Sequence, residues 1–128
     1  MSDTGGDPAC WAHLAGDDLT TRFEAIPDDG GSGVVWSLPH GGELDANIVR
    51  LAPGDAIGEH VNDQVDVLVV VWSGSGDLVV DARRVPLETG VITCVERGCS
   101  RSIRAGDDGL VYLSTHPRRG PLRIGRPD

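Results

Sequence analysis

The chain has 128 residues and a formal net charge of −9, and all of its positive side chains except the histidines are arginines. This length fits one domain with one hydrophobic core. The acidic balance argues against nucleic-acid binding, which needs a basic surface to neutralise phosphates. No apolar stretch is long enough to span a bilayer, and the first residues lack the basic and apolar regions of an export signal. We therefore expect a cytoplasmic protein with no nucleic-acid or membrane partner.

The three cysteines, Cys10, Cys94 and Cys99, form no CxxC pair. An odd number of cysteines without metal-ligand spacing indicates neither a disulfide framework nor a zinc ribbon. We therefore expect reduced thiols. Cys94 and Cys99 flank a predicted turn at 96–98, so a position opposite each other on a hairpin is the alternative.

Residues 1–33 are rich in Gly, Asp and Pro and predict an irregular N-terminal arm. A short helix fits residues 8–14, because Asp7 is a suitable N-cap and Pro8 suits the first helical position. We expect the arm to pack on the rest of the domain or on a neighbouring subunit, with Trp11 and His13 as contact residues.

Residues 34–117 alternate between short β-type runs and turn residues, which predicts an all-β barrel. The run at 65–72 is apolar at nearly every position, so it predicts a central strand covered on both faces. The proline-rich residues 118–128 predict an extended tail. Strands are expected at 34–38, 46–51, 65–72, 78–81, 91–95, 102–105 and 110–115, with turns at 39–42, 53–55, 73–76, 88–90, 96–98 and 106–109.

A glycine framework with histidine and carboxylate positions begins at Gly54. Five residues separate Gly54 from His60, and Asn62, Asp66 and Gly74 follow. This order resembles the first motif of the cupin superfamily, G-x5-H-x-H-x3-4-E-x6-G. Asn62 takes the place of the second histidine and Asp66 that of the glutamate, and the closing glycine comes one residue late.

A second segment resembles the second cupin motif, G-x5-P-x-G-x2-H-x3-N, through Gly90 and Gly98. Glu96 stands in the place of the proline, Arg101 in that of the last metal-binding histidine and Ala105 in that of the asparagine. The two motifs lie between residues 54 and 105, and the resemblance implies a double-stranded β-helix, a small jelly-roll barrel. The glycines fit places where a barrel turns tightly and positive φ is needed.

The resemblance also implies a metal cup in which imidazoles and a carboxylate hold a divalent transition metal. Such a site needs at least three good donors on one side of the ion. Arg101 instead brings a fixed positive charge to the place of the ion, and Asn62 is a poor ligand for a transition metal. We therefore predict no metal cofactor; the alternative is a divalent transition metal held by His60, Asp66 and His116.

Without a metal, Arg101 has two interpretations. It forms an ion pair with Asp66 or Glu59 that closes the cavity, or it binds a small anionic or carbonyl-bearing ligand together with neutral polar groups. Tyr112 lies in the middle of a predicted strand and either lines the pocket or belongs to the core. The predicted ligand-binding residues are His60, Asn62, Asp66, Arg101 and Tyr112.

Three functions remain open at this point. The first hypothesis is a small cupin-like protein that binds a small, possibly anionic molecule in the barrel without the usual catalytic metal. The second is a metal-dependent dioxygenase, isomerase or epimerase of the cupin type. The third is a structural or interaction module with a solid core. A homodimer is expected, with the apolar strand at 67–72 and the arm as its interface.

Overall fold

The computed structural model describes residues 19–27, 30–39 and 42–118. The helix predicted at 8–14, with Trp11 and His13, and the tail beyond residue 118 lie outside these residues. No helix among the described residues is long and apolar enough to cross a membrane. The expected all-β class is confirmed by the elements in chain order: η1 (Phe23–Ala25), β1 (Gly33–Ser37), β2 (Leu44–Leu51), β3 (Ala56–Val61), β4 (Val67–Val80), β5 (Arg83–Glu88), β6 (Ile92–Val95) and β7 (Ser100–Pro117).

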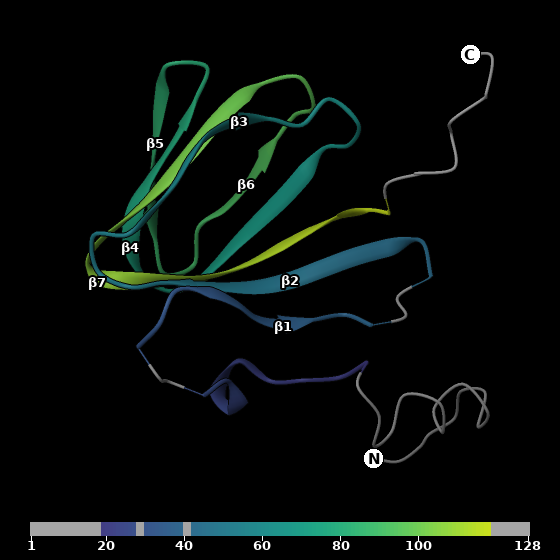
Figure 1. Ribbon diagram of the computed structural model, residues 1–128, viewed down its shortest axis with the longest axis vertical. Coiled ribbons are helices and arrows are strands. Elements are labelled where there is room, and N and C mark those ends of the chain that lie inside the picture. Colours follow the sequence, from purple (N-terminus) through teal and green to yellow (C-terminus); the bar gives the residue numbers. More distant parts are fainter. Residues whose placement is uncertain (1–18, 28–29, 40–41, 119–128) are drawn as a thin grey trace.

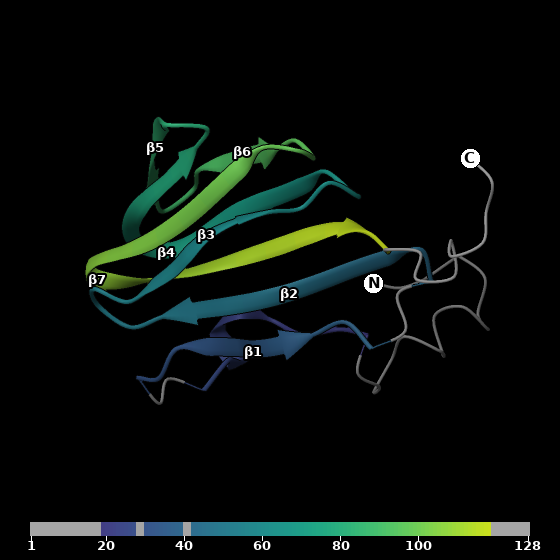
Figure 2. The same ribbon diagram turned by 45° about the horizontal axis from the view of Figure 1, so that its top comes forward.

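The strands pair antiparallel and form two facing layers. The β2 layer contains β1, β2 and β6, and the β3 layer contains β3 and β5. The long strands β4 and β7 pass through both layers, because residues 68–74 of β4 pair with 110–115 of β7, and residues 76–80 pair with 101–105. Figures 1 and 2 show β1 and β2 on one side of the barrel and β3 and β5 on the other.

Glycines mark the place where β4 and β7 bend from one layer into the other. A Cβ added to Gly74, which has φ +90°, would lie 2.1 Å from the carbonyl oxygen of Gly109, and one added to Gly76 would lie 2.4 Å from that of Arg104. The two strands therefore cross closely at a barrel corner. The turns predicted at 73–76 and 106–109 were wrong, since these glycines bend continuous strands, whereas Gly54 and Gly98 lie in turns as expected and have positive φ.

Two strands were missing from the sequence prediction, and both are edge strands. Among the described strands, β3 pairs only with β7, and β5 pairs only with β4. An edge strand is hydrogen-bonded to a neighbouring strand on one side only, so it tolerates residues that central strands avoid. Glu59 and Gly58 occur in β3, and Pro86 occurs in β5.

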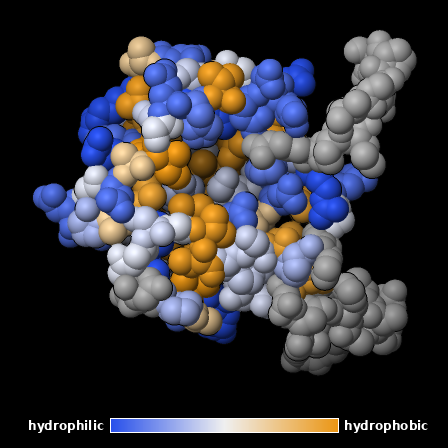
Figure 3. All heavy atoms as spheres, in the orientation of Figure 1, coloured by the Kyte–Doolittle hydropathy of each residue, from blue (hydrophilic) through white to orange (hydrophobic). Residues whose placement is uncertain are grey.

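The hydrophobic core lies between the layers and uses alternate residues of the strands. In β4, Val67, Val69 and Val71 are buried, whereas Leu68 and Trp72 are each 40% exposed on the outer face. The prediction that this strand is covered on both faces was therefore wrong for its outer side. Figure 3 shows hydrophobic residues, in orange, reaching the surface on one face of the molecule.

The described part of the N-terminal arm packs on the outside of the β2 layer. The Phe23 ring stacks on Trp72, with ring centroids 4.5 Å apart and planes 5° apart. Arg50 is buried, and its guanidinium donates a hydrogen bond to the carbonyl oxygen of Pro27. The arm therefore covers part of the barrel's own outer face, which is the first of the two arrangements expected for it.

Candidate functional site

A cavity of about 240 Å³ lies between the two layers. Its inner end is formed by core residues, and its polar groups come from both layers. The β3 layer and the residue after β3 contribute Ile57, His60, Asn62, Leu78, Arg101 and Ile103, and the β2 layer contributes Asn47, Val67, Val69, Val95, Tyr112, Ser114 and His116.

Arg101 lies in the part of β7 that belongs to the β3 layer, and it is only 6% exposed. Its Nη2 donates to the carbonyl oxygen of Glu96 at 3.4 Å, which is long for a hydrogen bond. Its Nε is buried without a hydrogen-bond partner, and no carboxylate of the described residues forms an ion pair with it. The cavity thus contains a positive charge whose hydrogen-bonding capacity is largely unused.

Neither of the two carboxylates considered as partners reaches Arg101. Glu59 accepts a hydrogen bond from the Ser100 hydroxyl. The Oδ1 atom of Asp66 accepts one from the backbone N–H of Arg97 at 2.8 Å. The alternative in which an ion pair with one of these residues closes the cavity is therefore wrong.

The structure also corrects the placement of Asp66, which is exposed and does not line the cavity. Val67, the next residue, faces the core. Because side chains alternate along an extended chain, Asp66 points away from the cavity. It instead stabilises the turn before β7, and it is available neither to a ligand in the cavity nor to the predicted metal set.

Asn62 is 9% exposed, and only the oxygen of its side-chain amide is hydrogen-bonded. Its Oδ1 accepts from the backbone N–H of Gln64 at 2.9 Å and from that of Val65 at 3.4 Å. Its Nδ2 is buried and has no hydrogen-bond partner. The side chain is therefore held in one orientation, and it presents a second unused donor beside Arg101.

A β-bulge in β3 directs His60 into the cavity. The register of β3 and β7 runs from Ile57 opposite Ile103 to His60 opposite Arg101, so β3 contains one extra residue. Ile57 and His60 consequently both line the cavity although they are three residues apart. His60 is exposed at the cavity mouth and lies directly across the strand pair from Arg101.

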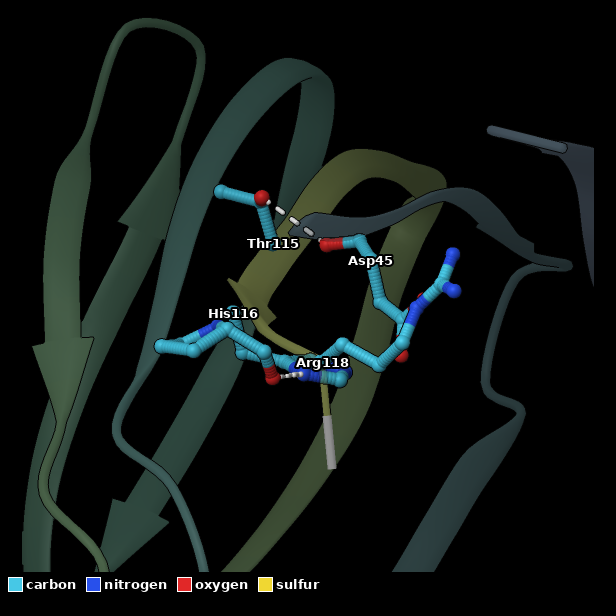
Figure 4. Close-up of polar contacts among 5 residues, drawn as sticks. Asp45, Thr115, His116 and Arg118 are labelled. Atoms are coloured by element: carbon cyan, nitrogen blue, oxygen red, sulfur yellow. Dashed lines mark hydrogen bonds and ion pairs between the residues drawn. The ribbon is translucent and has the colours of Figure 1, made fainter. Parts of the chain in front are cut away.

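The two cavity histidines are held in the same tautomer. His60 Nδ1 lies 3.0 Å from the carbonyl oxygen of Gly58, and His116 Nδ1 lies 2.8 Å from that of Pro117. A carbonyl oxygen only accepts, so Nδ1 carries the proton, and Nε2 of a neutral ring is left as an acceptor. Figure 4 shows His116 at the end of β7, next to the hydrogen bond between Thr115 and Asp45.

Three side chains of β7 form a polar row on the β2 layer. Tyr112, Ser114 and His116 alternate along the strand and all line the cavity. Burial raises the pKa of Tyr112 to about 12, so its phenol is neutral in ordinary buffers. Ser114 and its neighbour across the strand pair, Asn47, were not predicted from the sequence. The alternation of polar residues at 112, 114 and 116 is the signal that would have found Ser114.

The donor set does not fit a metal ion of the usual kind. Among the described residues, no three His, Cys, Asp or Glu side chains lie together in a way that could hold one. His60 and His116 line the cavity, but Asp66 lies outside it. Asn62 Oδ1 accepts two backbone N–H groups, and Arg101 adds a positive charge to the cavity.

The cysteines form no disulfide in the described part of the chain. Cys94 and Cys99 are free thiols. Cys94 pairs with Leu68 in the β4–β6 register and is exposed, whereas Cys99 packs against the core. A hydrogen bond to Asp81 raises the pKa of the Cys99 thiol, with a smaller contribution from burial, and this disfavours the reactive thiolate.

Solved structures share this fold. A protein from Thermus thermophilus has a TM-score of 0.69 at 14% identity, over 80% of this chain and 99% of that one. A cupin protein from Bacteroides fragilis has a TM-score of 0.59 at 19% identity, over 75% of this chain and 83% of that one. A conserved protein with a double-stranded beta-helix domain from Klebsiella pneumoniae has a TM-score of 0.61 at 17% identity, over 71% and 80%.

These similarities confirm the fold expected from the two glycine motifs: the chain has the double-stranded β-helix fold of cupin proteins. Identities of this size show the fold and no activity. No family model matches the chain, and no curated protein matches it. The homodimer and the cytoplasmic location stay predictions.

Proposed function

We propose that this small cupin-fold chain is a binding protein for a small carboxylate, which it holds in the cavity between its layers without a divalent metal. The observation that carries the proposal is the buried guanidinium of Arg101, which has no carboxylate partner among the described residues. An unpaired buried charge is costly, and a ligand carboxylate compensates it. A planar carboxylate also matches the fork of donors on a guanidinium.

The surroundings of Arg101 favour an anion over a cation. Asn62 Nδ2 adds a second buried donor without a partner. Among the described residues no aspartate or glutamate lines the cavity, so an anion meets no negative side chain from them. The net charge of −9 repels anions at long range, but this repulsion is screened beyond about 8 Å at physiological ionic strength. The local donors therefore decide binding.

The size of the cavity limits the ligand. The cavity volume of about 240 Å³ is below the range of about 300–1,000 Å³ that is usual for drug-sized ligands. A short organic acid fits this space. A barrel that served only as a structural module would be expected to have a solid core, so the cavity favours binding.

Thermal unfolding in the presence of short carboxylates tests the proposal. Acetate, propionate and butyrate should raise the melting temperature of the unmodified chain, since a ligand at 100 times its Kd stabilises by about 2.7 kcal/mol. The effect should vanish in Arg101→Met and persist in Arg83→Met. Arg83 is an exposed arginine of β5 and serves as the matched control.

Two results would contradict the proposal. One is stabilisation of Arg101→Met and of the unmodified chain to the same extent, which would exclude the guanidinium as the anion site. The other is about one tightly held transition metal per purified chain that is lost in His60→Ala. That result would favour the metal-dependent enzyme instead.

A further inference from the structure

We infer that the ligand is a hydroxycarboxylate, a small acid with at least one hydroxyl group, and that it bridges the two layers. Its carboxylate binds Arg101 in the β3 layer, and its hydroxyl binds His116 in the β2 layer. This inference rests on the proposed function, because it names the ligand class for the same cavity.

The two walls of the cavity offer opposite hydrogen-bonding groups. On one wall, two buried groups have no hydrogen-bond partner: Arg101 Nε and Asn62 Nδ2. Both are donors only. On the opposite wall, the bond from His116 Nδ1 to Pro117 leaves Nε2 as an acceptor that no described residue occupies. A carboxylate only accepts, whereas a hydroxyl also donates. A ligand that carries both groups therefore satisfies both walls.

The polar row on the β2 layer is larger than a plain fatty acid could use. The hydroxyls of Tyr112 and Ser114 make no hydrogen bond with any described residue, and both residues line the cavity beside His116. An alkyl chain against this row would leave the two hydroxyls and His116 Nε2 without partners. Sites built to bind a hydroxyl reject analogues that lack it for this reason.

A dicarboxylate fits the cavity less well than a hydroxycarboxylate. Arg101 is the single arginine among the described residues that line the cavity, and no lysine occurs in the chain. A second carboxylate at the β2 layer would meet the lone pair of His116 Nε2 and the neutral phenol of Tyr112. The wall can donate to it only through hydroxyls and an amide, so one negative charge per ligand is favoured.

Calorimetric titration with matched acids tests the inference on the full chain. The probes are propionate with lactate, butyrate with 3-hydroxybutyrate, butyrate with 4-hydroxybutyrate, and succinate. In at least one pair the hydroxylated acid should bind about tenfold more tightly, the difference expected for one buried hydrogen bond. His116→Phe should abolish that difference, and Ser114→Ala should reduce it.

His60→Phe is the matched control, because His60 lines the same cavity beside Arg101 in the β3 layer. A loss of the difference in His60→Phe but not in His116→Phe would place the hydroxyl next to the carboxylate and overturn the bridging arrangement. Equal binding within every pair, or tighter binding of succinate, would overturn the inference and leave the proposed function standing. Failure of every acid to bind would overturn both.

Discussion

Replacement of Arg101 by methionine should make the ligand-free protein more stable. The guanidinium is 6% exposed, its Nε has no partner, and its contact with Glu96 is a long 3.4 Å. A buried polar group without a partner costs about 1–3 kcal/mol, and hydrophobic replacement of buried charges is often stabilising. Arg101→Met fills a similar space without that cost, so we expect a gain of about 1–3 kcal/mol in the free energy of unfolding.

Urea unfolding followed by tryptophan fluorescence measures this gain, since the chain contains three tryptophans. For a domain of this size, a gain of 1 kcal/mol corresponds to a rise of about 4 °C in the melting temperature. The exposed control Arg83→Met should change stability by less than about 0.5 kcal/mol. A loss of more than about 1 kcal/mol in Arg101→Met would refute the reasoning, because it would mean that the charge is compensated in the free protein.

Three further predictions concern the barrel itself. Gly74→Ala should destabilise the protein by more than about 3 kcal/mol in urea unfolding, because Gly74 has φ +90° and the added Cβ would lie 2.1 Å from a backbone oxygen. Gly58→Ala is the control and should be neutral or stabilising, because nothing lies within 4 Å of its Cβ. Leu78→Ala should cost about 2–5 kcal/mol, since Leu78 is 1% exposed, and a loss below about 1 kcal/mol would argue against a packed core there. The single tyrosine, Tyr112, should ionise near pH 12 in an ultraviolet titration of the folded protein, and a midpoint near 10 would contradict its burial. Folding raises this pKa, so the free energy of unfolding should fall as the pH rises from about 10 toward 12. The total loss relative to neutral pH is about 3 kcal/mol.

The sequence predicts the fold through its glycines and valines, because both have a strict physical role. Gly74 needs positive φ and a close approach of two strands, and the alternate valines of β4 need a core. The edge strands β3 and β5 are not predictable in this way. They pair on one side only, so their residues obey weaker rules. The continuity of β4 and β7 through their bends is likewise hidden, since the same glycines are typical of turns.

The sequence predicts those cavity residues whose side-chain chemistry is itself informative. Arg101, Asn62, His60 and Tyr112 line the cavity, and their roles in binding stay predictions. Asp66 was misplaced, because it was assigned from its position in the motif, whereas the loop between β3 and β4 leaves it exposed next to the core-facing Val67. The bulge that aims His60 inward leaves no clear mark in the sequence, since it depends on the register against β7.

Asn47 carries no signal in the sequence, and Ser114 is marked only by the alternation of polar residues at 112, 114 and 116. Ser114 and Asn47 are common residue types, and they matter only because their strands meet at that position. The absence of an ion pair at Arg101 among the described residues is also a property of the folded chain. It depends on where Glu59 and Asp66 find other donors.

Nuclear magnetic resonance of the arginine side chains tests the central claim most directly. In a sample with ¹⁵N-labelled arginine, the Nε–H signal that disappears in Arg101→Met belongs to the cavity. Addition of 3-hydroxybutyrate should shift this signal in a saturable way and leave that of Arg83 unchanged. A signal that does not respond to any short carboxylate, while the protein stays folded, would contradict the claim that this guanidinium binds the ligand.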